Sequence, residues 1–322
     1  LKRADVAMYS AKAESRPFAH YGPEQDRYST ERLTVVTELR RAIEEGDLVM
    51  HYQPQVSLPG GALVGVEALM RWQHPVRGRL PPGEFIPLAE HTALIGPLTL
   101  HAIDLALGRA VHWGGAGRDL RVAVNISARN LLDAGFAGAV GAVLARHGAP
   151  ARRLELEITE TALMADPRRA LEVLTELDAM GVALSIDDFG VGYTSLTYLK
   201  SLPVGALKID RSFVQGMLGD PADAMIVRSI VDLARNLGLG VVAEGIESQE
   251  VLDALAGLGC ETEQGFHIGR PMSPDRFEHW LGAVPFAIFV LLFLIMPPMR
   301  IVIGAFQTPD GTFTLENIRG LF

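Results

Sequence analysis

Cysteine is almost absent from this sequence. The 322 residues include one cysteine, Cys260, so no disulfide can form within the chain. A lone cysteine with apolar neighbours is usually a small core residue, and we predict that role here rather than a catalytic nucleophile. A chain without disulfides suits a reducing compartment, and we expect it to work in the cytoplasm.

Basic residues are outnumbered as well. The chain has 29 lysines and arginines against 38 acidic residues, which gives a formal net charge of -9. Such a charge opposes non-specific attraction to the phosphate backbone of long nucleic acids. We therefore expect no long nucleic acid as a partner, and any phosphate ligand would need locally concentrated positive charge.

Long apolar runs are confined to the C-terminal end. The start of the chain, from Leu1, lacks the apolar stretch of a signal peptide. Residues 283–299 carry no charge and are interrupted by Pro285 and by Pro297-Pro298. This run reaches the lower length limit of a membrane span. Two interpretations stay open, namely membrane contact through residues 283–304 or a helix packed on the rest of the protein.

The pattern divides the chain into residues 1–30, 31–281 and 282–322. The middle part alternates helix-like segments with eight strand-like segments, several of them nearly continuous apolar runs of the kind found in strands covered on both faces. The strand-like segments are Leu48–Pro54, Leu63–Trp72, Leu120–Ile126, Leu154–Thr159, Val182–Asp188, Ala206–Asp210, Leu239–Glu244 and Glu261–Phe266. Asp166-Pro167 and Asp220-Pro221 each predict a capped helix start. This alternation favours a closed α/β barrel of the TIM type, although an open doubly wound sheet has the same local pattern.

Polar side chains occur where the predicted strands end. These residues are Glu67, Asn125, Glu157, Asp187, Asp188, Lys208, Glu244 and Gln264. In a parallel barrel the carboxyl ends of the strands share one rim, so these side chains would converge there. One lysine cannot neutralise five clustered carboxylates, and the cluster therefore needs cations.

The ligand types indicate which cations. Carboxylate and amide oxygens without histidine or cysteine suit Mg²⁺ or Mn²⁺ rather than Zn²⁺. The adjacent carboxylates of Asp187 and Asp188 would suit two ions about 3.5 to 4 Å apart. Phosphodiester hydrolysis is the chemistry that such sites most often serve.

The same segments resemble the EAL family of phosphodiesterases, which act on the bacterial second messenger cyclic di-GMP. The matching motifs, in the order of the family, are Tyr52-Gln53-Pro54, Glu67-Ala68-Leu69, Phe85-Ile86-Pro87-Leu88-Ala89-Glu90, Val124-Asn125-Ile126-Ser127, Glu157-Ile158-Thr159-Glu160, Asp187-Asp188-Phe189-Gly190, Lys208-Ile209-Asp210 and Ala243-Glu244-Gly245. An ordered series of this kind is far more specific than a three-letter motif. The resemblance covers residues 31–281 and implies an (β/α)8 barrel whose first strand is antiparallel to the others.

The resemblance also implies an activity and residue roles. It implies hydrolysis of cyclic di-GMP to linear pGpG with two Mg²⁺ or Mn²⁺ ions; Ca²⁺, which is larger and looser in coordination, is expected to inhibit. One ion would be held by Glu67, Asn125, Glu157 and Asp187, and the other by Asp187, Asp188 and Glu244. Lys208 and Glu244 would orient or deprotonate the attacking water, Gln264 would support metal-bound waters, and Gln53, Arg71 and Asp210 would lie near the substrate.

The loop after Asp188 differs slightly from the family. The resemblance implies that Glu160 anchors this loop and that the loop links the metal site to dimerisation, so a homodimer is expected. Val191 stands where the family commonly has threonine, and Phe266 stands where it often has tyrosine. Neither is a proposed metal ligand, so we expect tuned rather than abolished activity.

The two ends resemble other proteins. Residues 4–12 look like the last helix of a GGDEF diguanylate cyclase domain, whose catalytic body is missing, so no cyclase activity is expected. Residues 284–322 look like the first transmembrane region of an ABC-type permease. Two other functions therefore stay open: a receptor that binds cyclic di-GMP without cleaving it, and a membrane-anchored transport component.

Each candidate residue also has a purely structural interpretation. Glu67 or Lys208 alone would more often be an ion-pair partner, and Asp187-Asp188 would more often cap a segment. The sequence pattern favours the site because all of these residues occur together and in order. The four histidines His51, His74, His91 and His101 lack ligand spacing and are predicted to be surface or core residues.

Overall fold

The computed structural model describes residues 23–58, 60–192 and 195–289. By its internal contacts the chain divides after Pro271 into two compact units. The segment that resembles a GGDEF domain, residues 4–12, lies outside the described residues. The same holds for the apolar and permease-like residues 290–322.

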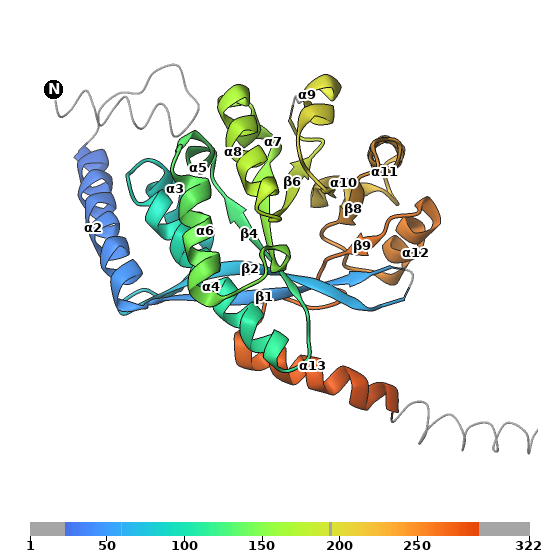
Figure 1. Cartoon of the computed structure of the whole chain (residues 1–322), viewed down its shortest axis with the longest axis horizontal. Helices are drawn as coiled ribbons and strands as arrows, with labels where there is room; N and C mark the ends of the chain where they lie inside the picture. The colour runs from blue at the N-terminus through green and yellow to red at the C-terminus, as the bar shows by residue number, and fades with distance from the viewer. Residues whose placement is uncertain (1–22, 59, 193–194, 290–322) are drawn as a thin grey trace, which may run out of the picture. The chain divides into compact units, whose positions relative to one another are not determined.

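The strands of the first unit close into a barrel (Figure 1). They are β1 (Leu48–Ser57), β2 (Leu63–His74), β3 (Gly78–Leu80), β4 (Arg121–Ile126), β5 (Leu154–Thr159), β6 (Ala183–Phe189), β7 (Ala206–Ile209), β8 (Gly240–Ala243) and β9 (Thr262–Glu263). The order is β1-β9-β8-β7-β6-β5-β4-β2-β3, and an additional pairing between β1 and β2 closes the ring. This closure excludes the open sheet. β3 pairs only with β2 and forms a ribbon with it outside the ring.

The strand directions confirm the predicted architecture. β1 is antiparallel to both of its neighbours, β2 and β9, whereas β2, β4, β5, β6, β7, β8 and β9 follow one another in parallel. The fold is thus a closed α/β barrel of eight strands with an antiparallel first strand. The carboxyl ends of the seven parallel strands share one rim.

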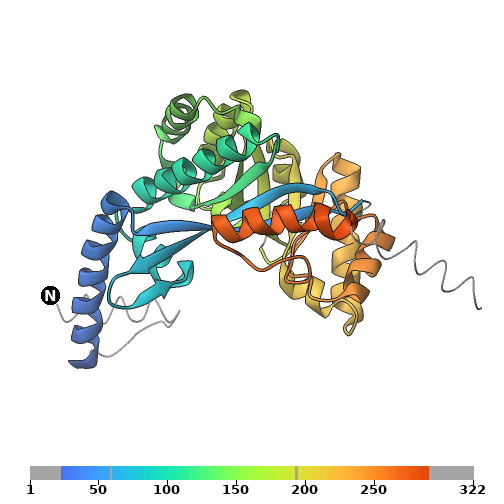
Figure 2. The same ribbon diagram turned by 90° about the horizontal axis from the view of Figure 1, so that it is seen from below.

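Helices cover the outside of the strands, as the green helices in Figure 2 show. In the first unit they are α2 (Pro23–Glu45), α3 (Pro82–Glu90), α4 (Ile95–Gly115), α5 (Ala128–Leu132), α6 (Phe136–His147), α7 (Glu160–Leu163), α8 (Pro167–Ala179), α9 (Leu196–Ser201), α10 (Arg211–Gly216), α11 (Pro221–Leu237) and α12 (Gln249–Leu258), with a 3-10 turn at Ala151–Arg153. The second unit contains helix α13 (Pro274–Phe289). The two predicted helix starts are confirmed. Asp166 accepts a hydrogen bond from the backbone of Arg169, and Asp220 accepts one from Ala222.

The alternation of side chains along β5 shows why the barrel carries a polar interior. Leu154, Leu156 and Ile158 are fully buried on one face, towards the surrounding helices. Glu155 and Glu157 lie on the opposite face, inside the ring, because successive side chains of a strand point to opposite sides. The same alternation places polar residues of the neighbouring strands inside the barrel.

Two expected boundaries fall within helices. Helix α2 continues from Pro23 to Glu45 and so crosses the boundary expected at residues 30 and 31. Helix α13 continues to Phe289, past the boundary expected at residues 281 and 282. Among the described residues, no helix has both the length and the apolar character that a membrane crossing requires.

Candidate active site

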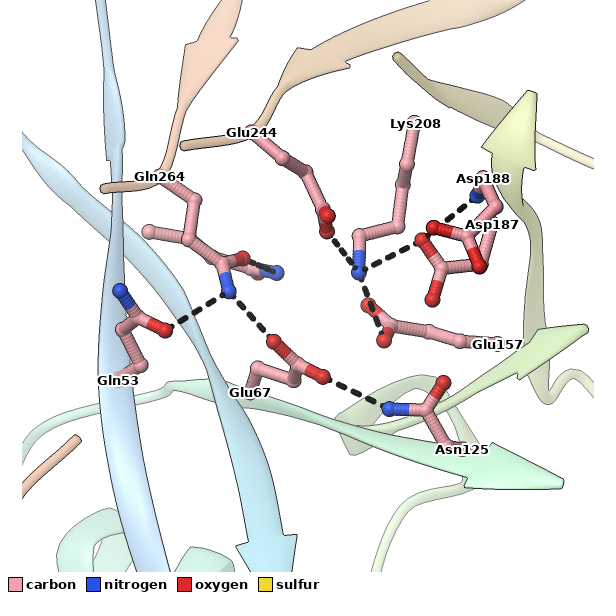
Figure 3. A network of polar contacts seen from close by, with 10 residues as sticks. Gln53, Glu67, Asn125, Glu157, Asp187, Asp188, Lys208, Glu244 and Gln264 are labelled. Atoms are coloured by element: carbon pink, nitrogen blue, oxygen red, sulfur yellow. Dashed lines mark hydrogen bonds and ion pairs between the residues drawn. The ribbon is translucent and has the colours of Figure 1, made fainter. Parts of the chain in front are cut away.

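Lys208 lies at the centre of the acidic residues (Figure 3). This residue of β7 is fully buried. Its Nζ is 2.7 Å from Oε2 of Glu157, 2.5 Å from Oε1 of Glu244 and 3.4 Å from Oδ1 of Asp187. The three carboxylates come from β5, from the end of β8 and from β6, so three separate strands supply the partners of one cation.

The electrostatics of this cluster show an excess of negative charge. Burial raises the pKa of Glu244 to about 8, although the nearby Lys208 ammonium opposes that rise. Burial also raises the pKa of Glu157 well above its ordinary value. For Lys208, burial lowers the pKa, but the surrounding carboxylates outweigh burial and raise it well above the ordinary value. Lys208 therefore stays charged, and its single charge cannot balance its neighbours.

Glu67 is held on both of its carboxylate oxygens. Oε1 accepts a hydrogen bond of 2.7 Å from Nδ2 of Asn125, and Oε2 accepts one of 2.5 Å from Nε2 of Gln264. Gln264 also donates to Oε1 of Gln53 at 3.3 Å and accepts from Nε2 of Gln55 at 2.9 Å. The hydrogen bonds of Gln264 thus orient the Glu67 carboxylate.

Gln55 is a residue of this network that the sequence analysis missed. It is buried and lies two residues after Gln53 on β1. Residues two apart on a strand share a face, and this period-two relation to Gln53 is the signal that identifies it.

The carboxylates of Asp187, Asp188 and Glu244 gather on the other side of the cluster. Each offers one oxygen, and these oxygens lie within 4.8 Å of one another. Asp188 adopts a backbone φ of 52°, the left-handed region, as no other non-glycine residue among those described does. Burial, with the charge of Asp187 second, raises the pKa of Asp188 to about 6.

Asp210 contacts this group from the start of α10. Its side chain caps the helix by accepting a hydrogen bond of 2.9 Å from the backbone of Ser212. A further hydrogen bond to Asp188 raises the pKa of that carboxyl. The structure therefore places Asp210 beside a proposed metal ligand.

The donor atoms of the site fit hard divalent cations. Oε1 of Glu157 is buried and receives no hydrogen bond from the described residues, so it is available as a ligand. Asn125 uses its amide nitrogen towards Glu67, which leaves the amide oxygen for an ion. When all five carboxylates are ionised, they and Lys208 together carry a formal charge of about −4, which two divalent cations would neutralise. The five are Glu67, Glu157, Asp187, Asp188 and Glu244.

Glu160 connects the loop after Asp188 to α7. Its Oε2 accepts hydrogen bonds from the backbone nitrogens of Gly190, at 3.1 Å, and Gly192, at 2.9 Å. A Cβ atom at Gly192 would lie 2.7 Å from the Glu160 carboxyl carbon, so glycine is needed for this approach. Val191 lies between the two glycines and is 61% exposed. Residues 193 and 194 of the loop lie outside the described residues.

Of the three residues expected near the substrate, Asp210 is described above, and the other two, Gln53 and Arg71, lie on β1 and β2. Gln53 donates to the carbonyl of Gly269 at 3.2 Å, in addition to its bond with Gln264. Arg71 is half-buried, and its Nη1 donates to the carbonyl of Met70 at 2.7 Å. Because Arg71 and Glu67 are four residues apart on β2, they lie on the same face of the strand.

Histidine and cysteine are absent from the group of possible metal ligands that the described part of the chain contains. The group of three possible ligands found among the described residues contains carboxylates alone. His74 is buried and bonds Glu38 of α2 at 3.1 Å, which is a structural role. Cys260 is buried, and burial raises the pKa of its thiol to about 12. The burial of Cys260 confirms the prediction that it is a core residue.

The fold and site define an α/β-barrel protein with an acidic, oxygen-rich centre at the carboxyl ends of its strands. The sequence profile of the EAL domain matches residues 36–271. This match spans most of the sequence, and the chain belongs to the EAL domain family.

Similar proteins agree with this assignment. The chain is 44% identical over 275 residues to the bifunctional diguanylate cyclase/cyclic di-GMP phosphodiesterase MucR of Pseudomonas aeruginosa, covering 85% of this chain and 40% of MucR. It is 38% identical over 266 residues to the cyclic di-GMP phosphodiesterase PA2567 of the same organism, covering 82% of this chain and 45% of that protein. The chain thus spans less than half the length of these curated relatives.

A solved structure is similar as well. The structure of the MucR phosphodiesterase in complex with c-di-GMP has a TM-score of 0.73 and 45% sequence identity, and the match covers 76% of this chain and 99% of that chain. The similarity therefore extends over the whole of the solved phosphodiesterase part.

Proposed function

We propose that this chain hydrolyses cyclic di-GMP to linear pGpG with the help of two Mg²⁺ or Mn²⁺ ions. The observation that carries the proposal is the group of carboxylates around Lys208, with the oxygens of Asp187, Asp188 and Glu244 within 4.8 Å of one another. The named activities of the similar proteins support the choice of substrate.

Each acidic residue would have a defined part in holding the ions. When bound, the ions would neutralise the phosphate charge and activate a water molecule. The first would be held by Glu67, Asn125, Glu157 and Asp187, and the second by Asp187, Asp188 and Glu244. The hydrogen bonds from Asn125 and Gln264 keep Glu67 oriented towards the centre.

Glu244 and Lys208 would handle the proton of the reaction. The water oxygen forms a bond to one phosphorus, and the bond from that phosphorus to a sugar oxygen breaks; the sugar oxygen leaves with the bonding electron pair and takes up a proton from solvent. Glu244 would take the water proton, because its carboxylate lies at the end of β8 beside the other proposed metal ligands. Lys208, 2.5 Å from Glu244, would hold that carboxylate in position.

The test is direct turnover. The purified chain would be incubated with cyclic di-GMP and Mn²⁺, and pGpG would be sought by chromatography. We expect product with Mn²⁺ or Mg²⁺, none with a chelator, and inhibition by Ca²⁺. Glu244→Gln should abolish turnover, whereas Glu176→Gln, which removes an exposed carboxylate from α8, should not.

A receptor that binds without cleaving is the alternative from another functional class. It predicts binding of cyclic di-GMP by calorimetry with no pGpG at any metal concentration, and that result would refute the enzyme. The full set of carboxylates around Lys208 favours the enzyme, because a receptor needs no such cluster.

The proposal includes a homodimer. Its interface would be the face of helix α11 that lies beside Gly190, in the loop after Asp188. Met225 of α11 is 64% exposed and lines a groove of about 440 Å³ together with Gly190 and Ile226. A second copy of the chain would cover this apolar face. Met225→Asp should shift the mass in light scattering towards the monomer, whereas Met180→Asp, at the C-cap of α8, should leave it unchanged. An unchanged mass for both variants would exclude this interface. The cytoplasmic location expected from the sequence also remains a prediction.

A further inference from the structure

Gln55 begins a chain of side-chain hydrogen bonds inside the barrel. It is buried on β1, and its Nε2 donates a hydrogen bond of 2.9 Å to Oε1 of Gln264. Gln264 in turn donates from Nε2 to Oε2 of Glu67 at 2.5 Å, a contact that Figure 3 shows. The hydrogen bonds therefore run in one direction, from Gln55 through Gln264 to the carboxylate of Glu67.

The side-chain amide of Gln264 has a partner for each of its polar atoms. Its nitrogen carries two hydrogens, and it donates to Glu67 and, at 3.3 Å, to Oε1 of Gln53. Its oxygen accepts the hydrogen bond from Gln55. Gln264 is only 4% exposed, so solvent does not freely replace a lost partner. Without Gln55 the Gln264 oxygen would be a buried acceptor that has lost its donor, which is an unfavourable state.

The Gln264 amide could in principle adopt a second orientation. A half-turn of a glutamine amide exchanges its nitrogen and oxygen with little change of shape. In Gln264 that half-turn would bring the oxygen against the Glu67 carboxylate, so two acceptors would face each other and Glu67 would lose a hydrogen bond. At the other end of the amide, two nitrogen donors would face each other, because Nε2 of Gln55 points there. Gln55 thus favours the orientation in which Gln264 donates to Glu67.

Gly65 provides the space that the Gln55 side chain occupies. The two residues are partners in the pairing of β1 with β2. A Cβ atom at Gly65 would lie 3.0 Å from Oε1 of Gln55 and 3.1 Å from the carbonyl oxygen of Arg121. Glycine is therefore the residue that lets the Gln55 amide pack closely against the neighbouring strand and reach Gln264.

We propose that Gln55 is a positioning residue of the metal site, which fixes the amide orientation of Gln264 and thereby the carboxylate of Glu67. This inference rests on the proposed function, because Glu67 would hold the first ion of that site. A carboxylate that is already oriented needs less rearrangement when the ion binds, so less binding free energy is lost in ordering it. Loss of Gln55 should therefore weaken metal binding and leave the chemical step nearly unchanged once the ion is bound.

The test compares Gln55→Met with His147→Met. Methionine is about as long as glutamine but has no hydrogen to donate. His147 bonds Asp104 of α4 at 2.7 Å, and its position at the end of α6 places it at the amino ends of the strands, opposite the proposed metal site. Its replacement thus also removes one hydrogen bond between two elements, but far from the ions.

Calorimetry with Mn²⁺ and turnover at saturating Mn²⁺ separate a positioning role from a general loss of stability. For Gln55→Met we expect the Kd of one Mn²⁺ ion to rise about three- to tenfold, the effect of one lost hydrogen bond, with kcat at saturating Mn²⁺ within about twofold of the unsubstituted protein. His147→Met should lower the Tm and leave the Kd values unchanged.

A double-mutant cycle with Gln264→Met tests whether Gln55 acts through Gln264. In the Gln264→Met protein no amide remains to be oriented. Adding Gln55→Met to it should therefore have no further effect on the Kd of Mn²⁺. A direct effect of Gln55 on the ions would instead raise this Kd by the same factor in both backgrounds.

Two results would overturn the positioning role. One is an unchanged Kd of Mn²⁺ in Gln55→Met, and the other is an equal rise of this Kd with and without Gln264. Failure of the proposed function looks different, because the unsubstituted protein would then bind Mn²⁺ without forming pGpG. The comparison of Kd values would still decide for or against Gln55. Absence of Mn²⁺ binding by the unsubstituted protein would overturn both proposals.

Discussion

Replacement of Lys208 by methionine tests the balance of charge at the centre of the barrel. The substitution keeps the length of the side chain and removes the one cation that contacts Glu157, Asp187 and Glu244. Loss of one partner from a buried ion pair costs about 3 to 5 kcal/mol. Glu244 already has a pKa of about 8 and can take up a proton, so we expect the lower end of this range.

The loss should be visible in thermal unfolding with a chelator present. For a domain of this size 1 kcal/mol corresponds to about 2 to 4 °C, so about 3 kcal/mol should lower the Tm by roughly 10 °C. Saturating Mn²⁺ should restore part of it, because an ion at one hundred times its Kd stabilises by about 2.7 kcal/mol. Turnover of cyclic di-GMP should fall about a hundredfold.

Lys200→Met is the control, since Lys200 is exposed on α9. It should melt within about 1 °C of the unsubstituted protein. If Lys208→Met also melted within about 2 °C of this control in chelator, Lys208 would not be the counter-ion that the geometry indicates.

Three further predictions concern the metal ligands, the loop and the thiol. Asp187→Asn should abolish Mn²⁺ binding in calorimetry while circular dichroism stays unchanged, because the amide keeps the shape and loses the charge. Glu160→Ala leaves the backbone nitrogens of Gly190 and Gly192 without their acceptor. It should lower turnover about tenfold and lower the free energy of unfolding by about 1 to 3 kcal/mol. Full activity of this variant would contradict the role of Glu160 in holding the loop. Burial raises the Cys260 pKa to about 12, so a thiol reagent at pH 8 should label the protein after denaturation but not before, and rapid native labelling would show that the thiol is accessible.

Much of the barrel is predictable from local pattern. The eight strand-like segments overlap the eight strands of the ring, and Asp166-Pro167 and Asp220-Pro221 begin helices α8 and α11 as their sequence indicates. Local signals suffice there, because cap residues and apolar periodicity act over a few neighbouring positions. The short β3 was not predicted, since three residues are too few to show a period.

The candidate site was predictable as a set of residues but not as a network of contacts. Sequence order and parallel topology place Glu67, Glu157 and Glu244 at one rim. The bond between Gln55 and Gln264, separated by 209 positions, depends on how β1 and β9 meet in space. The left-handed backbone of Asp188 also escapes prediction, because aspartate adopts it where tertiary contacts enforce it.

The sequence by itself determined which residues are candidates for the chemistry, because strand and helix signals together with the ordered motifs assign each polar residue to a strand end. Tertiary structure alone decided which oxygen faces which nitrogen, that one buried Lys208 contacts three carboxylates, and that Gln55 donates to Gln264. The physical reason is the separation along the chain over which each effect acts. Propensity and periodicity act between near neighbours in the chain, whereas charge, burial and strand register act between residues that only the closed barrel brings together.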